Sequence, residues 1–191
     1  MSFSKILIIA AHPDDELIGC GGTILKFKKK SKIKIIFTCK TYDKRNQSKK
    51  IILSNDRQNI ARKVSIDLKI LKPVFLNYNG LSLKRKDITK LSQSIYDEIE
   101  KFKPTAILTH CIDDNHHDHR ATAEATFIAS RPSKKNSFIK KVLSFEIASA
   151  SEKLIKKNRA FNPNLFIDIS STYKNKIKLI KKFYKNIIKP Y

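Results

Sequence analysis

The sequence predicts an α/β protein, a Rossmann-like three-layer sandwich around a mostly parallel sheet. Apolar, strand-like runs alternate with amphipathic helical segments along the chain, an arrangement typical of βαβ units with right-handed crossovers. The first run, KILIIAA at 5–11, is apolar at nearly every position, as in a strand that helices cover on both faces. The chain has 191 residues and no low-complexity linker, so we expect residues 1–191 to form a single domain.

The first half of the chain contains signals for strands and for two helices. Apolar runs bounded by turn residues predict strands at 5–11, 33–40 and 72–77. A helix is expected at 21–30, with its apolar side chains facing the core and its lysines facing solvent. The polar segment 41–54 predicts a loop, followed by a helix at 55–68 with its cap near Ser54 or Asn55. A turn is expected at 78–80.

The second half repeats this alternation. Ile88, Leu91, Ile95 and Ile99 recur at helical spacing, which predicts an amphipathic helix that ends before Pro104. Further apolar runs predict strands at 105–110, 142–149 and 165–170. Two more helices are expected, at 119–130 and 172–189, the second of them strongly basic.

The net charge of +23 is the most unusual feature of the composition. It indicates either an anionic partner or a solvated basic surface. Only seven of the 40 basic residues are arginines, although arginine suits bidentate phosphate recognition better than lysine does. Aromatic residues do not alternate with the basic clusters either. We therefore favour a solvated surface that attracts anions over a nucleic-acid site.

From the remaining composition we expect a cytoplasmic protein. No apolar run is long enough to span a bilayer, and segment 5–11 reads as a strand because acids follow it at once, without a cleavage site. Peripheral attachment to a membrane stays open. The three cysteines, Cys20, Cys39 and Cys111, form no CxxC pair, and their odd number argues against a complete disulfide framework.

Two polar clusters each follow a predicted strand. HPDDE, at 12–16, follows the first strand, and the segment THCIDDNHHDHR, at 109–120, begins at the end of the strand predicted at 105–110. Ligands of parallel α/β sheets bind beyond the carboxyl ends of the strands. HPDD alone could be a helix N-cap, and HHDH alone could be a polar loop or an adventitious metal-binding segment. Two such clusters at the ends of strands of one predicted sheet indicate an active site.

The residue types of the two clusters fit hydrolytic zinc. Zinc in such sites commonly takes three protein ligands and leaves one position for water, and His12, Asp15 and His119 are expected to supply them. Asp14 would act as general base. His116 would stabilise the oxyanion or protonate the leaving group, and Asp118 would hydrogen-bond its imidazole and keep it cationic. His110 and the pair Asp113–Asp114 are rival ligands, ranked lower.

Other enzyme classes lack their motifs here. The GCGG segment at 19–22 does not match the dinucleotide-binding spacing, and no acidic residue closes the second strand. No GxSxG motif and no Walker lysine motif is present. Gly21 and Gly22 are expected to let the first helix approach the sheet and the ligand closely. Phosphoester hydrolysis is also disfavoured, because phosphatases commonly use two metals.

AHPDDE after a first strand, paired with a later D-x-H-x-D-H-R, resembles the PIG-L/LmbE-like zinc N-deacetylases. The resemblance extends to the segments RATAEA, FEIASASE and FNPNLFIDIS, and covers residues 3 to about 182. It implies removal of an acetyl group from N-acetylglucosamine-type conjugates, with release of acetate. It also implies His12, Asp15 and His119 as zinc ligands, Asp14 as base, and His116 as electrophilic or acid group.

Two departures from the family pattern affect the substrate more than the reaction. The family tends to have Arg followed by Glu on a helix, whereas Arg57 is followed by Gln58 and Asn59; Arg57 remains a candidate substrate-binding residue. Many relatives also continue past the last helix with a further histidine-containing segment, whereas this sequence ends at NIIKPY. We expect a compact variant, or a substrate wall that is missing or supplied by a partner subunit.

The sequence therefore favours a deacetylase with one Zn²⁺ per chain, and another divalent metal stays open. Its expected substrate is a small-molecule or glycolipid amino sugar, anionic rather than neutral, and homo-oligomerisation is left open. The alternative is a non-enzymatic basic module that binds nucleic acid or an anionic membrane surface. The pair of His/Asp clusters distinguishes the two, because a binding module has no need of them.

Overall fold

Aliphatic runs form a five-stranded sheet in the computed structural model, which describes residues 3–41, 50–81, 83–148 and 161–185. The strands are β1 (Lys5–Ala10), β2 (Lys32–Lys40), β3 (Val74–Asn79), β4 (Ala106–His110) and β5 (Lys141–Phe145). Their order across the sheet is β3-β2-β1-β4-β5, and every neighbouring pair is parallel. The predicted α/β class with a parallel sheet is confirmed.

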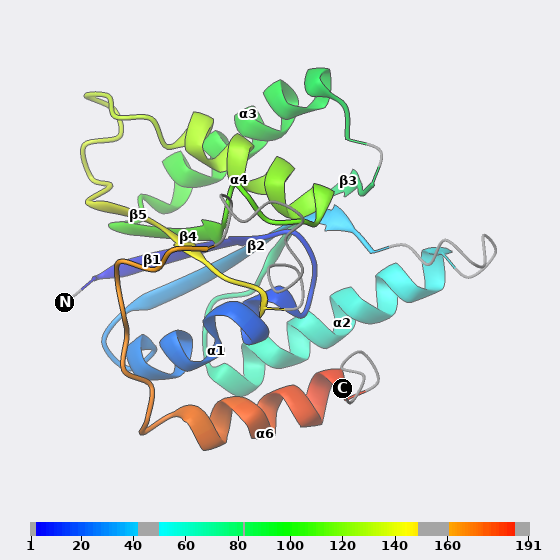
Figure 1. Ribbon diagram of the computed structural model, residues 1–191, viewed down its shortest axis with the longest axis vertical. Helices are drawn as coiled ribbons and strands as arrows, with labels where there is room; N and C mark the ends of the chain where they lie inside the picture. The colour runs from blue at the N-terminus through cyan, green and yellow to red at the C-terminus, as the bar shows by residue number, and fades with distance from the viewer. Residues whose placement is uncertain (1–2, 42–49, 82, 149–160, 186–191) are drawn as a thin grey trace.

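Helices cover both faces of this sheet and complete the three layers (Figure 1). One face carries α1 (Asp15–Phe27), α2 (Lys50–Leu68) and α6 (Tyr173–Tyr184), and the other carries α3 (Arg85–Phe102) and α4 (His117–Ala129). The strand β1 contributes to both cores. Ile6 and Ile8 belong to the core on the α1 side, whereas Leu7 and Ile9 belong to the core on the α3 side. Successive side chains of a strand point to opposite faces, so a doubly covered strand needs apolar residues throughout.

The chain changes direction across the sheet at β1, which lies between β2 and β4. The helix that follows β1, α1, packs on one face, and the helix that follows β4, α4, packs on the other. The segments leaving β1 and β4 therefore diverge at the carboxyl ends of these strands, which is where ligands of such sheets bind. Both polar clusters of the sequence lie at this topological switch point.

Several element boundaries differ from the prediction. The first helix begins at Asp15 rather than at Gly21, because the carboxylates of its first turn interact favourably with the positive end of the helix dipole. The helix α2 includes Lys50, four residues before the predicted cap, and segment 42–49 of the expected loop lies outside the described residues. Tyr78 and Asn79 belong to β3 rather than to a turn, because they pair with Cys39 and Lys40 of β2.

The predicted strand at 165–170 is wrong. Its alternating pattern is real, but this segment pairs with no strand of the described sheet. It packs against α1 instead: Lys26 Nζ donates to the carbonyl oxygen of Asp168 at 2.6 Å, and Ile169 lies over Gly22. Phe166 is 80% exposed as a result. The two late glycines of α1 thus serve contact with this segment and with α6, not with the sheet or a ligand.

We expect Gly22→Ala to destabilise the protein by about 1–3 kcal/mol. A Cβ at this position would lie 2.6 Å from Ile169 Cδ1 and 2.9 Å from Ile169 Cβ, so the segment after residue 161 would have to move. Gly21→Ala is the matched control, since its Cβ would meet the flexible Lys176 chain at 3.2 Å and alanine favours helix by about 1 kcal/mol. Chemical unfolding of both variants measures the difference; equal stabilities would contradict this packing.

Candidate active site at the switch point

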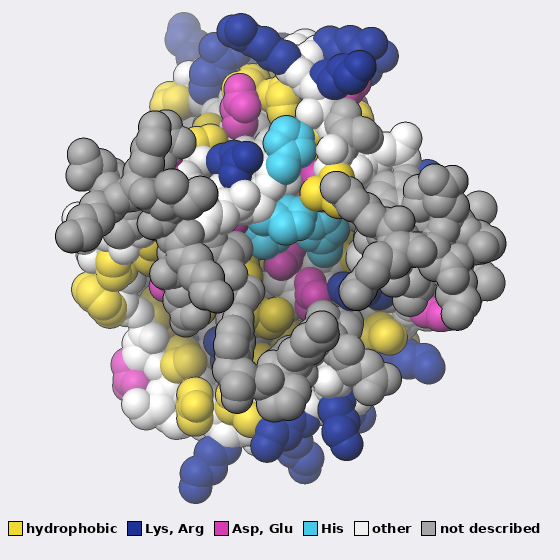
Figure 2. All heavy atoms as spheres, turned by 45° about the vertical axis from the view of Figure 1, so that its right-hand side comes forward, with side chains coloured by type: hydrophobic (Ala, Val, Ile, Leu, Met, Phe, Trp, Pro, Cys, Tyr) yellow, Lys and Arg dark blue, Asp and Glu magenta, His cyan; other side chains and the backbone are white. Residues whose placement is uncertain are grey.

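The ends of two strands and the starts of two helices bring the polar clusters together. His12 follows β1, Asp14 and Asp15 begin α1, His110 ends β4, and the segment 116–119 begins α4. Figure 2 shows the histidine side chains gathered near the centre of one face, with acidic side chains beside them. Residues about a hundred positions apart in sequence thus share one site, as the ends of parallel strands predict.

Asp15 lies at the centre of this cluster and is almost completely buried. Its Oδ2 is 3.7 Å from His12 Nδ1 and 3.3 Å from His110 Nε2, and its Oδ1 is 3.4 Å from His119 Nε2. Burial alone would raise the pKa of the Asp15 carboxyl, but His119 and His110 hold it well below its usual range. Asp15 is therefore a buried carboxylate.

In two of these histidines, the ring nitrogen that does not face Asp15 contacts a second carboxylate. His12 Nε2 is 2.9 Å from Asp118 Oδ2, and His119 Nδ1 is 2.9 Å from Asp114 Oδ2. With the proton of each ring on the nitrogen facing its carboxylate, the lone pairs of His12 Nδ1 and His119 Nε2 face Asp15. Metal-binding histidines almost always have such a partner.

The cluster stabilises positive charge. Burial would lower the pKa of both histidines, yet hydrogen bonds to Asp118 and Asp15 raise the pKa of His12 to about 9. The charge of Asp15 and a hydrogen bond to Asp114 raise the pKa of His119 to about 10 against the same effect of burial. Two nitrogen donors and a carboxylate in an environment that favours cations are a donor set that fits a divalent metal.

Asp14 is the N-cap of α1 and has a strained backbone, with φ of 136°. Its N–H donates to Glu16 Oε2 at 2.8 Å, and Glu16 Oε1 accepts from the Tyr184 hydroxyl at 2.7 Å. Arg57 Nη1 donates to Asp14 Oδ2 at 3.0 Å. Burial and the neighbouring Asp15 raise the pKa of Asp14 to about 6 despite Arg57. A carboxyl with a pKa near neutrality is suited to general base catalysis.

His116 differs from the prediction in its charge. Its Nδ1 accepts from the backbone N–H of Asp118 at 3.2 Å, whereas the Asp118 carboxylate contacts His12 and the Leu81 N–H. Burial and the neighbouring His119 lower the pKa of His116 to about 4. The expected ion pair between Asp118 and a cationic His116 is therefore wrong. His116 is a neutral imidazole whose Nε2 carries the proton, so it can donate a hydrogen bond.

The family model for PIG-L, described as GlcNAc-PI de-N-acetylase, matches residues 7–130, which include both clusters. The chain belongs to the PIG-L family. This confirms the predicted enzyme class, an N-deacetylase that hydrolyses C–N bonds. No curated protein sequence matches the chain. None of the helices within the described ranges is long and apolar enough to cross a membrane.

Solved structures share the fold at low sequence identity. N,N'-diacetylchitobiose deacetylase from Pyrococcus horikoshii is 20% identical, with a TM-score of 0.71 over 97% of this chain and 72% of its own. The zinc-inhibited form of teicoplanin deacetylase Orf2 is 14% identical, with a TM-score of 0.69 over 94% and 84%. GalB from Pseudomonas putida, a 4-carboxy-2-hydroxymuconate hydratase, is 18% identical, with a TM-score of 0.68 over 95% and 79%. Because a hydratase shares this fold, the fold alone does not determine the reaction.

Sequence reasoning ranked His110 and Asp114 only as rival ligands, and the structure gives both a different place in this PIG-L family site. His110 Nε2 accepts from the Ala11 N–H at 2.9 Å, and its ring stacks on His119 at 3.9 Å. Asp114 lies behind His119. Glu16 and Tyr184 were missed altogether, although the final E of HPDDE was a signal for Glu16. Nothing local in the sequence points to Tyr184, because this residue lies on α6 and reaches Glu16 only through the packing of α6 against α1.

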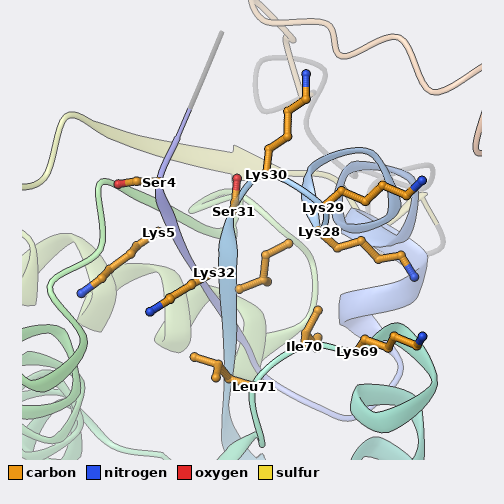
Figure 3. Close-up of a pocket in the computed structure, with 11 residues that line it drawn as sticks. Ser4, Lys5, Lys28, Lys29, Lys30, Ser31, Lys32, Lys69, Ile70 and Leu71 are labelled. Atoms are coloured by element: carbon orange, nitrogen blue, oxygen red, sulfur yellow. The ribbon is translucent and has the colours of Figure 1, made fainter.

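A basic cavity of about 630 Å³ lies at the opposite end of the sheet (Figure 3). It is lined by residues 4–5, 28–33 and 69–71, at and next to the amino ends of β1 and β2. Figure 3 shows Lys28, Lys29 and Lys69 extending to the same side. Ligands of such sheets bind at the carboxyl ends, so this cavity is separate from the candidate active site.

We expect Asp114→Asn to weaken metal affinity about 10- to 100-fold. The amide cannot accept the His119 Nδ1 proton as strongly as the carboxylate does at 2.9 Å, so the orientation and basicity of the ring suffer. Asp67→Asn removes a carboxylate from an exposed ion pair with Lys182 and is the control for charge. Competition with a fluorescent chelator measures the affinity; equal affinities in the two variants would exclude a supporting role for Asp114.

Proposed function

We propose that this member of the PIG-L family is a zinc-dependent deacetylase of an N-acetylated amino sugar, with its chemistry at the switch-point cluster. The observation that carries the proposal is the convergence of three donors. His12 Nδ1 and His119 Nε2 lie 3.7 Å and 3.4 Å from the two Asp15 oxygens, and the other nitrogen of each ring has a carboxylate partner. His12, Asp15 and His119 would hold the metal.

A divalent metal held there would supply Lewis acidity toward the acetamide carbonyl and would lower the pKa of water. The chain's own residues carry the proton and the oxyanion. Asp14 takes a proton from the attacking water, and the ion pair with Arg57 orients its carboxylate. The neutral His116 donates its Nε2 proton as a hydrogen bond to the oxyanion. The amine then leaves with the proton held by Asp14, and acetate is the second product.

In this mechanism Arg57 acts on Asp14 rather than directly on substrate. Its guanidinium contacts Asp14 Oδ2 and the Pro13 carbonyl. The substrate-binding role considered for Arg57 is therefore replaced by a positioning role. The non-enzymatic alternative, a basic module for nucleic acid or membrane, finds no support in the family match.

The test is a deacetylation screen with purified, metal-loaded protein. N-acetylglucosamine conjugates that differ in aglycone are incubated with the enzyme, and released acetate and free amine are quantified together. We expect equal amounts of both products, with zinc supporting activity at one equivalent per chain. Since a fold relative is described as zinc-inhibited, Mn²⁺, Co²⁺ and Fe²⁺ are tested in parallel. Amine release from no conjugate with any of these metals would refute the function.

The lysine excess gives a prediction about the substrate, which we propose to be anionic. With a net charge of +23, raising salt should lower kcat/KM for an anionic conjugate and leave kcat nearly unchanged, because screening acts on encounter. A neutral conjugate with the same sugar is the control and should show no salt effect on kcat/KM. Equal salt responses of the two conjugates would show that the net charge does not contribute to substrate binding and only reflects the composition of the surface. A steep salt-dependent affinity for DNA or RNA would instead favour the binding module.

A further inference from the structure

Two groups of three potential metal ligands at the switch point share no residue. One consists of Asp15, His110 and His119, and the other of His12, Cys39 and Asp118. In each group the ligand atoms all lie within 4.8 Å of one another. The second group contains a thiol, which the proposed deacetylase chemistry does not use.

The sheet and two backbone contacts assemble the second group. The N–H of Cys39 in β2 donates to the Ala11 carbonyl at 3.0 Å, which sets this residue beside His12. The Leu81 N–H donates to Asp118 Oδ1 at 2.6 Å, and Asp118 Oδ2 lies 2.9 Å from His12 Nε2. The ring nitrogen of His12 on this side is therefore Nε2, and the one facing Asp15 is Nδ1.

The surroundings of His12, Cys39 and Asp118 hold these side chains close together and shield two of them from solvent. A Cβ at residue 80 would fall 2.5 Å from Asp118 Oδ2 and 3.1 Å from the Lys40 carbonyl oxygen, so Gly80 is needed for the approach of Asp118. Cys39 is 5% exposed and Asp118 is 1% exposed. Three donors of the types that zinc accepts thus converge from three separate segments, with Cys39 and Asp118 buried and His12 partly exposed.

We propose that His12 Nε2, Cys39 Sγ and Asp118 Oδ2 form a second metal site that takes a thiophilic divalent ion, such as Cd²⁺ or zinc in excess. Thiolate selects soft metals, whereas the nitrogen and oxygen donors of the first group tolerate harder ones. On binding, the thiol releases its proton to solvent and the Cys39 thiolate becomes the ligand. His12 binds the metal through Nε2 as a neutral imidazole that keeps one proton, on Nδ1, and any second proton is released to solvent.

Occupation of this site withdraws His12 from the metal site proposed above at His12, Asp15 and His119. A neutral imidazole has a lone pair on only one of its two nitrogens, so His12 cannot serve both metals without becoming an imidazolate. A metal held by Cys39 leaves His12 Nδ1 protonated toward Asp15. We infer that soft metals inhibit by removing a ligand from the metal beside Asp15. This consequence rests on the proposed function, whereas the second site itself does not.

The site is tested with Co²⁺ and Cd²⁺ alone, by absorption spectroscopy of the full chain. Thiolate coordination produces a ligand-to-metal charge-transfer band in the ultraviolet, which nitrogen and oxygen ligands do not produce. We expect this band in the wild type and its complete loss in Cys39→Ala. Cys20→Ala is the matched control, since Cys20 is equally buried but lies within α1, and it should keep the band. Cys39→Ser preserves size if the alanine variant does not fold, and it should also lack the band.

Two outcomes would overturn the second site: absence of the band in the wild type, or its persistence in both Cys39 variants. Inhibition is measured separately. The Cd²⁺ concentration for half-inhibition should rise about tenfold or more in Cys39→Ala and should not change in Cys20→Ala. Loss of a residue that only supports a metal ligand already lowers metal affinity by about tenfold or more, so loss of a ligand should lower it at least as much. A Cys39-dependent band without Cys39-dependent inhibition would refute the competition alone. A Cys39-dependent band in a protein that deacetylates no conjugate would refute the proposed function and keep the site.

Discussion

Replacing Asp14 by Asn should lower turnover by roughly 100- to 10,000-fold while the metal remains bound. The amide keeps the size of the carboxyl but cannot take a proton from water. Asp14 is the acid of the HPDDE turn that contacts Arg57, whereas Asp15 faces the histidines. The two adjacent acids thus have different surroundings and are expected to have different roles.

The pH profile gives Asp14 a second signature. The pKa of Asp14 is raised to about 6, and a base acts in its deprotonated form, so kcat/KM should rise with pH through about 6. The remaining activity of Asp14→Asn should lack this rise. Asp15→Asn is the matched variant and should lose metal instead. Loss of metal from Asp14→Asn with retention in Asp15→Asn would show that the two roles are reversed.

His119→Ala should abolish stoichiometric metal binding and lower turnover by about 1,000-fold or more, because electrostatic stabilisation of the oxyanion is lost with the metal. His119 contacts both Asp15 and Asp114. His117→Ala is the control on the same helix, since His117 contacts the Leu83 carbonyl instead. Metal analysis after dialysis and single-turnover kinetics measure the two effects.

His119→Ala should also cost stability, which the position of this residue in the sequence does not suggest. His119 is 4% exposed, and its removal takes one imidazole partner from each of the buried Asp15 and Asp114 carboxylates. An unsatisfied buried group costs about 1–3 kcal/mol. Circular dichroism and chemical unfolding should therefore show a folded but weaker protein. Stoichiometric metal in this variant would remove His119 from the ligand set.

The two motifs were sufficient to predict that the two polar clusters meet at one edge of the sheet. HPDDE and HHDH each follow a predicted strand, and in a parallel sheet the carboxyl ends of neighbouring strands meet at one edge. The alternation of apolar runs and helical segments predicted the parallel sheet, because a strand covered by helices on both faces needs apolar residues at odd and even positions alike. These features depend on local periodicity and on chain order, which a sequence contains in full.

The partners of each side chain could not be read in this way. Asp118 is two residues from His116, yet its carboxylate contacts His12, which is 106 residues away in the sequence. Tyr184 reaches Glu16 across 168 residues, and the predicted strand at 165–170 packs on α1 instead of pairing. Such contacts depend on which face each helix covers and on how the segments cross.

The sequence by itself determined the fold class, the enzyme family and the edge of the sheet at which the chemistry is expected, since periodicity and motif order carry that information. Only the tertiary structure decided the charge of His116, the pairing of Arg57 with Asp14 and the approach of Cys39 to His12. The physical reason is that hydrogen bonds and ion pairs act over a few ångströms in space. A separation in sequence does not fix that distance until the strands are in register and the helices are packed.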